Sequence, residues 1–212
     1  MSFQPRLDIL PPPQRRLWGE LGALPAWFTL YGGTAVALHL GHRGSIDFDF
    51  FGSQGFDPRS LAALPLLAGG TVAQIEPQTL SVVLDRGGPV KISFFGLPDF
   101  PRLAPTVHGP NGPPIASLLD LAGTKASVVQ VRAEAKDYID LDALIAAGVD
   151  LPRALAAGRA LYGAAFAPQS TLKALSYFDD GDLPDLPAAV RQRLQAAVRA
   201  VDPAQLPTLE PL

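Results

Sequence analysis

The chain has 212 residues, enough for one large domain or two small ones with a sizeable core. It is 48% hydrophobic and 17% charged, as globular proteins are, and the lack of cysteine excludes disulfides and thiolate metal sites. A net charge of −3 argues against a protein that coats nucleic acid regardless of sequence; with neither a secretory signal nor a long apolar run, we expect a cytoplasmic protein that makes no use of the membrane.

The N-terminal part of the chain predicts two helices with a strand between them. Residues 14–24 place leucines at helical spacing after three prolines, which can lead into a helix. The apolar run from Trp27 to Tyr31 has the length of a strand. A Gly-Gly-Thr turn follows it, and residues 35–40 continue with a short helical pattern.

Two aspartates on the next predicted strand are the strongest candidates for a metal site. Residues two apart in a strand share a face, so Asp47 and Asp49 point the same way, while Ile46, Phe48 and Phe50 point into a core. Neighbouring carboxylates repel each other, and a divalent metal with oxygen ligands offsets that cost well. The alternative is a half-buried edge strand whose polar positions happen to be aspartate.

This stretch resembles a known pattern. The turn, the helix and then Arg-x-Ser-x-Asp-x-Asp with flanking aromatic residues look like the nucleotidyltransferases of the polymerase-beta-like superfamily, and most closely the AbiEii/AbiGii toxin family. The resemblance implies that a triphosphate lies at Gly32, Gly33 and Thr34, that Arg43 and Ser45 orient the phosphate or the metal strand, and that Asp47 and Asp49 hold one or two Mg²⁺ ions.

Further strands are predicted on the C-terminal side of the aspartates. Residues 58–67 read as a short helix capped by Asp57, and apolar runs at 71–75, 80–84 and 90–95 have strand length, the last two joined by a hairpin at 86–89. In the last run the alternation sends Val90, Ile92 and Phe94 inward and puts Lys91, Ser93 and Phe95 on the opposite face.

Ser93 departs from the pattern of the superfamily, in which this strand usually presents a third carboxylate. A hydroxyl is a weaker ligand for a hard cation and no general base at neutral pH. Three explanations stay open: two aspartates with the substrate phosphates suffice, another carboxylate reaches in, or catalysis is reduced. Asp137 is the candidate for a recruited base, because Asp85 at a hairpin end should point away.

A proline-rich segment, residues 98–114, reads as a linker, and no strand is predicted beyond it. We therefore expect an α+β protein: a small mixed-sheet core with flanking helices in residues 1–114, and a helical domain in residues 115–212 that closes the nucleotide cleft. Ser117 and Asp120 form a capping-box pattern before a helix over 118–132. Three more helical stretches, separated by Pro168 and Pro184, follow a helix over 134–145.

A second block, Lys-x6-Arg followed by Lys-Asp-Tyr-x-Asp-Leu, is similar to the second conserved block of the same family. The resemblance implies that Lys125 contacts the nucleotide phosphates, that Asp137 supports catalysis or positions the base, and that Arg132 and Asp140 brace the helices, with Arg132 near the nucleotide. The alternative is ordinary, since helix surfaces commonly carry Lys–Asp pairs.

Together these patterns favour a Mg²⁺-dependent nucleotidyltransferase that moves a nucleoside monophosphate from a nucleoside triphosphate (NTP) to an acceptor hydroxyl. The resemblance further implies the toxin of a toxin–antitoxin or phage-defence pair, with tRNA as acceptor and a cognate antitoxin as partner. One rival is a transferase acting on a small molecule or a protein. Another is a degenerate member that binds a nucleotide or a partner without transfer.

Overall fold

The computed structural model describes residues 3–212, which form two compact units. The first unit runs to Phe100 and also takes in Thr106–Ala116. The second consists of Pro101–Pro105 and Ser117–Leu212. Each unit buries its own set of apolar side chains.

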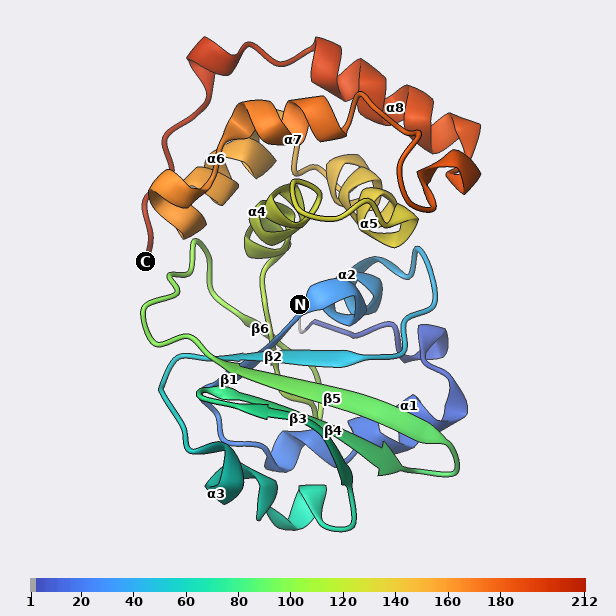
Figure 1. Ribbon diagram of the computed structural model, residues 1–212, viewed down its shortest axis with the longest axis vertical. Coiled ribbons are helices and arrows are strands. Elements are labelled where there is room, and N and C mark those ends of the chain that lie inside the picture. The colour runs from blue at the N-terminus through green and yellow to red at the C-terminus, as the bar shows by residue number, and fades with distance from the viewer. Residues whose placement is uncertain (1–2) are drawn as a thin grey trace. The chain divides into compact units, whose positions relative to one another are not determined.

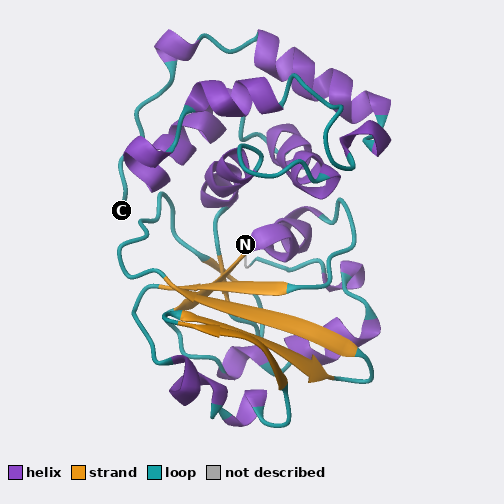
Figure 2. Ribbon diagram, viewed as in Figure 1, coloured by secondary structure: helices purple, strands orange, loops and turns teal. Residues whose placement is uncertain are grey.

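The first unit is built on a seven-stranded mixed sheet with the order β3-β4-β5-β2-β1-β7-β6 (Figures 1 and 2). Its strands are β1 (Phe28–Tyr31), β2 (Phe48–Gly52), β3 (Thr71–Glu76), β4 (Thr79–Asp85), β5 (Pro89–Gly96), β6 (Val107–His108) and β7 (Pro114–Ile115). The β1–β7 and β2–β5 pairs are parallel, and the other neighbouring pairs are antiparallel. The predicted α+β class with a mixed sheet is confirmed.

Helices lie on both sides of this sheet. They are α1 (Pro12–Trp18), α2 (Gly32–Leu40) and α3 (Pro58–Ala62), with short 3₁₀ turns at Leu7–Ile9, Leu21–Ala23 and Pro65–Leu67. Figure 1 shows α2 on one side of the sheet and α1 and α3 on the other. The side with α1 and α3 holds an aromatic core in which the Phe94 ring centroid lies 4.9 Å from that of Phe28 and 5.5 Å from that of Phe50.

The alternation predicted for β5 is confirmed. Val90, Ile92 and Phe94 are fully buried, whereas Lys91 is exposed. The predicted cap of α3 is also present, because the Asp57 carboxylate accepts a hydrogen bond of 2.9 Å from the backbone N–H of Ser60. That helix ends at residue 62, and a separate 3₁₀ turn begins at Pro65, so the single helix predicted over 58–67 is wrong in its length.

Three predictions for this unit are wrong. The helix predicted over 14–24 ends at Trp18 and is followed by a 3₁₀ turn. Ile46 is 57% exposed instead of buried, because β2 begins only at Phe48. The proline-rich segment contains β6 and β7, since the N–H of Ala116 and the pairing of Leu30 with Ile115 attach it to β1. Two-residue strands carry no periodicity that could reveal them in a sequence.

The second unit is helical. It contains α4 (Leu118–Val128), α5 (Ala135–Ala146), α6 (Leu151–Tyr162), α7 (Pro168–Ala174) and α8 (Ala188–Arg199), with 3₁₀ turns at Gly163–Ala165, Leu183–Asp185 and Pro203–Gln205. α4 packs on α5 and α6, α5 on α8, and α6 on α7. The capping box is confirmed, because the backbone N–H of Asp120 donates to Ser117 Oγ over 3.0 Å. α4 ends four residues before the predicted position 132.

No helix within residues 3–212 is both long enough and apolar enough to cross a membrane.

The contact between α4 and α6 depends on Gly123. A Cβ atom at this position would lie 2.8 Å from Leu161 Cδ1 and 2.9 Å from the backbone carbon of Ala157. Both distances are shorter than a normal carbon–carbon contact, so the two helix backbones are too close for any side chain here. The packing of the helical unit is therefore set by the absence of a side chain at one position.

We predict that Gly123→Ala lowers the free energy of unfolding by about 1–3 kcal/mol, because the added methyl overpacks the α4–α6 contact. Urea unfolding followed by far-UV circular dichroism measures this. Gly19→Ala is the matched control: Gly19 has φ −62° and its nearest neighbour would be 3.7 Å from the new Cβ. Equal stability of the two variants would contradict the close α4–α6 contact.

Candidate active site

The two predicted metal ligands lie at the start of β2. Asp49 is in register with Tyr31 on β1 and with Ser93 on β5, and Asp47 comes one residue before the strand begins. Both aspartates are half-buried, whereas Phe48 and Phe50 are fully buried. The carboxylates are therefore held by a rigid strand while still reachable from solvent.

Gly32 brings the turn between β1 and α2 against Asp49. Its φ is +71°, a left-handed conformation that glycine adopts without strain. A Cβ atom on Gly32 would lie 2.6 Å from Asp49 Oδ2, too close for any side chain. Two independent constraints thus require glycine here, and they place the backbone at the start of α2 next to a carboxylate of the candidate metal pair.

Thr34 and Ser45 form a buried hydroxyl chain that ends on the backbone of Asp47. Ser45 Oγ and Thr34 Oγ1 are 2.7 Å apart, and Thr34 Oγ1 donates a short hydrogen bond to the carbonyl oxygen of Asp47. A hydroxyl carries one hydrogen, so Ser45 must be the donor to Thr34. Thr34 is only 1% exposed. These contacts favour a role in positioning Asp47 over the predicted contact of Thr34 with a triphosphate.

Arg43 lies on the segment that leads into β2. Its Nη1 donates to the carbonyl oxygen of Gly44 over 2.9 Å, and the side chain is half-buried. A guanidinium has five N–H donors, so this bond still leaves it the chemistry to bind an anion.

The donor set suits a hard cation that also binds phosphate. Within residues 3–212 no three His, Cys, Asp or Glu side chains are clustered as a complete metal cage would need. Mg²⁺ is commonly held by one or two carboxylates together with substrate phosphates and water, and Asp47 and Asp49 supply that number. The residues therefore fit a metal that arrives with a nucleotide better than a permanently bound one.

The β2–β5 register places Ser93 directly beside Asp49. Ser93 is 2% exposed, and its Oγ accepts a hydrogen bond of 3.1 Å from Ser81 Oγ on β4. The strand that was expected to carry a third carboxylate thus presents a buried pair of hydroxyls. Asp85 lies at the far end of β4, where its carboxylate accepts from the N–H groups of Gly87 and Gly88.

The second unit contains a buried ionic cluster made from the second sequence block. Lys125 Nζ lies 2.7 Å from Asp137 Oδ1 and 2.7 Å from Asp140 Oδ2, and Arg132 Nε donates to Asp137 Oδ2 over 2.7 Å. Both aspartates are fully buried, and Lys125 is 5% exposed. These residues are a packed network joining α4 to α5 and not ordinary pairs on a helix surface.

The pKa of Asp137 reflects this setting. Burial by itself raises it, but the hydrogen bond from Arg132 and the positive charge of Lys125 outweigh burial and hold the pKa below its usual range. Both carboxylate oxygens already accept hydrogen bonds from cations. A buried carboxylate of this kind is a weak base, so its contacts favour a positioning role over the predicted role of recruited general base.

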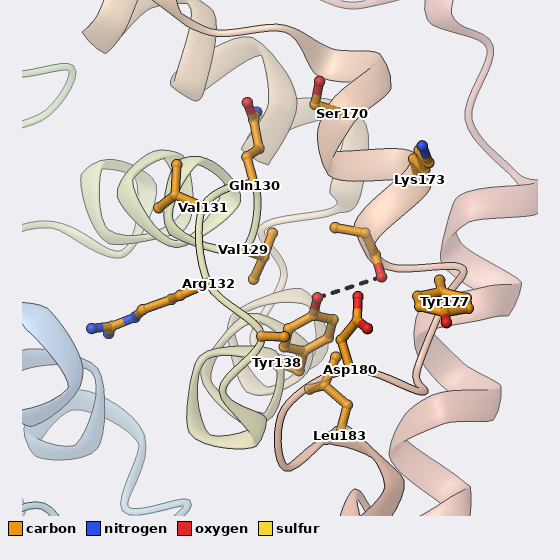
Figure 3. Close-up of a pocket in the computed structure, with 12 residues that line it drawn as sticks. Val129, Gln130, Val131, Arg132, Tyr138, Ser170, Lys173, Tyr177, Asp180 and Leu183 are labelled. Atoms are coloured by element: carbon orange, nitrogen blue, oxygen red, sulfur yellow. Dashed lines mark hydrogen bonds between the residues drawn. The ribbon is translucent and has the colours of Figure 1, made fainter.

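A cavity of about 500 Å³ adjoins this cluster in the second unit (Figure 3). It is lined by the loop after α4, by α7 and by the loop after α7. In Figure 3 the Arg132 side chain extends to one side and Tyr177 lies on the other, with Lys173 above Tyr177. Tyr138 Oη donates to the carbonyl oxygen of Ala174 over 3.4 Å, and burial raises the pKa of this phenol. The cavity combines a half-exposed aromatic ring with charged groups.

A mixed sheet with two strand carboxylates beside a glycine turn, followed by a helical unit, defines the nucleotidyltransferase class. The family model described as "Nucleotidyl transferase AbiEii toxin, Type IV TA system" matches residues 17–210. The chain therefore belongs to the AbiEii family of nucleotidyltransferase toxins, as the sequence resemblance had predicted.

Solved structures agree with this fold. MenT4, a nucleotidyltransferase toxin from Mycobacterium tuberculosis H37Rv, matches with a TM-score of 0.61 and 16% identity over 93% of this chain and 84% of that one. JHP933 from Helicobacter pylori matches with a TM-score of 0.54 and 16% identity over 88% of each chain. At such identity the similarity concerns the fold alone. No curated protein matches the chain significantly.

Sequence reasoning missed two parts of the site. The Ser45–Thr34–Asp47 chain joins residues 11 and 13 positions apart, and neither hydroxyl shows from its sequence position that it bonds to protein instead of ligand. Ser81 was read only as part of an apolar strand. Its polar side chain among buried neighbours was the available signal, since a buried hydroxyl needs a partner.

We predict that Asp137→Asn lowers the free energy of unfolding at pH 7 by about 3–5 kcal/mol, because it leaves Lys125 and Arg132 without their shared charge. The pKa of Asp137 is lowered in the folded state. Its contribution is therefore complete above the unfolded pKa of about 4 and is lost as the pH falls through the lower folded pKa.

Urea unfolding of the wild type and of Asp137→Asn between pH 7 and pH 3 measures this difference, which should shrink toward the acid end. Asp185→Asn, at an exposed position in the same unit, is the control and should change stability little. A difference between wild type and Asp137→Asn that does not depend on pH would contradict the ion-pair account.

Proposed function

We propose that this protein transfers a nucleoside monophosphate from an NTP to an acceptor hydroxyl, with Mg²⁺ held by Asp47 and Asp49. The observation that carries the proposal is the contact of the Gly32 turn with Asp49, since a Cβ at Gly32 would fall 2.6 Å from Asp49 Oδ2. Backbone N–H groups at the start of α2 attract phosphate oxygens, and the adjacent carboxylate attracts the cation that accompanies them.

Each residue at this site has a separate task in the proposal. When bound, Mg²⁺ neutralises charge on the phosphates during in-line transfer. Asp47 and Asp49 orient it, and the Thr34 hydroxyl fixes the backbone of Asp47. Gly32 and Gly33 leave room for the triphosphate, and Arg43 pairs with a phosphate oxygen.

Lys125 and Arg132 are proposed to contact the nucleotide phosphates as well. An ammonium group has three N–H donors, and Asp137 and Asp140 occupy two of them, which leaves one for a phosphate. The two buried carboxylates would hold the ammonium in one place. This preorganisation reduces the entropy that is lost when the nucleotide binds.

RNA is the acceptor that we propose, with tRNA as the specific class, and an antitoxin encoded with the toxin is the proposed partner. The cavity of the second unit supports an RNA acceptor, because the half-exposed Tyr177 ring can stack on a base while Lys173 pairs with a phosphate. A cytoplasmic location and a role in phage defence are parts of the same proposal.

The first test is the double variant Asp47→Asn, Asp49→Asn. We expect Mg²⁺-dependent turnover of radiolabelled NTP to fall on the order of 10³-fold, about 4 kcal/mol of transition-state stabilisation. The fold should remain, because removing two like charges relieves repulsion. Asp99→Asn, at an exposed site in the same unit, is the control. Turnover that persists in the double variant would contradict the metal assignment.

The second test identifies the acceptor. Radiolabelled NTP is incubated with total cellular RNA, and we expect label in the RNA fraction. Tyr177→Ala and Lys173→Ala should each weaken RNA binding about 5- to 100-fold, the usual effect of losing one stacking or phosphate contact. Arg153→Ala, which removes one exposed positive charge from α6, should leave binding nearly unchanged.

Other outcomes favour the rival functions. Label found in protein or in a small molecule, and not in RNA, would favour a different acceptor. Metal-dependent nucleotide binding without pyrophosphate release would favour a degenerate protein. In that case an inactive wild type that gains activity in Ser93→Asp would identify the missing third carboxylate as the cause.

A further inference from the structure

Three side chains form a polar row across the centre of the sheet. Asp49 on β2 is in register with Ser93 on β5, and Ser93 is in register with Ser81 on β4. Residues in register on neighbouring strands point to the same face of a sheet, and the strands are about 4.8 Å apart. The row therefore runs from the candidate metal ligand to two successive serines on one face.

The hydrogen bonds in this row have a direction. Ser81 Oγ donates to Ser93 Oγ over 3.1 Å, so Ser81 has used its only hydrogen and Ser93 has accepted it. Ser93 keeps a hydrogen of its own to donate. Its neighbour on the side opposite Ser81 is Asp49, and a carboxylate is the stronger acceptor available in this register.

Both serines are 2% exposed, in a part of the sheet where apolar side chains would be the ordinary choice. On the other face of the same strands Leu80, Val82 and Ile92 are fully or almost fully buried. A buried hydroxyl whose hydrogen is not donated costs free energy. Two adjacent buried hydroxyls beside a functional carboxylate are therefore better explained by that carboxylate than by the core.

We propose that Ser81 and Ser93 are positioning residues for Asp49. Ser93 donates its hydrogen to one Asp49 oxygen and fixes the carboxylate rotamer, so that the other oxygen faces the metal, while Ser81 fixes the direction of the Ser93 hydroxyl. This inference rests on the proposed function. It assigns a task to the residue that stands where a third carboxylate was expected: Ser93 orients a metal ligand instead of being one.

The test measures metal binding without relying on activity. Mn²⁺ replaces Mg²⁺, and its dissociation constant in the presence of a nucleoside triphosphate is measured by electron paramagnetic resonance. Ser93→Ala should weaken Mn²⁺ binding about 10- to 100-fold, the usual effect of removing a hydrogen bond to a metal ligand. Ser81→Ala should weaken it less, because Ser93 keeps its own hydroxyl. Ser93→Thr, which restores a hydroxyl at the same atom, should recover most of the affinity.

The control is Thr29→Ala on β1, which removes a hydroxyl that is 7% exposed and lies outside the row. It should lower stability much as the serine variants do and leave Mn²⁺ affinity unchanged. If the wild type binds Mn²⁺ and Ser93→Ala binds it equally well, the positioning role is wrong while the proposed function stands. If the wild type itself binds no Mn²⁺ with the nucleotide, both are wrong.

Discussion

The repulsion between two carboxylates on one strand is the constraint on which the first unit depends. Asp47 and Asp49 are close enough to disfavour each other, so the surrounding chain must hold them in place. β2 is paired on both sides, by β1 and by β5, and Thr34 binds the backbone of Asp47. The Gly32 turn lies against Asp49. A cation relieves the repulsion, and the phosphates that come with it meet the start of a helix.

The helical unit solves a related problem with the opposite result. Asp137 and Asp140 are also close together, but Lys125 and Arg132 neutralise them within the protein, and both carboxylates are fully buried. One pair of acids is therefore kept accessible for a ligand, whereas the other is consumed in holding a lysine. Accessibility, and not the number of charges, separates a metal site from a positioning network.

Most of the fold could be predicted because its elements have clear periodicity. The three long strands of residues 71–96 and the helices after Ser117 follow alternating or helical patterns, and the structure has them within a few residues. The misses lie where the local signal is weak. β6 and β7 have two residues each, and the N-terminal helix stops at Gly19 although the leucine spacing continues.

The sequence by itself determined the family and the two acidic pairs, because close spacing on a strand or helix fixes which residues share a face. Only the tertiary structure decided what those residues touch. It made Thr34 a support for Asp47, buried Asp137 between two cations, and set Ser93 between Asp49 and Ser81. The reason is that burial and hydrogen-bond partners come from segments distant in the chain, and local spacing contains no information about them.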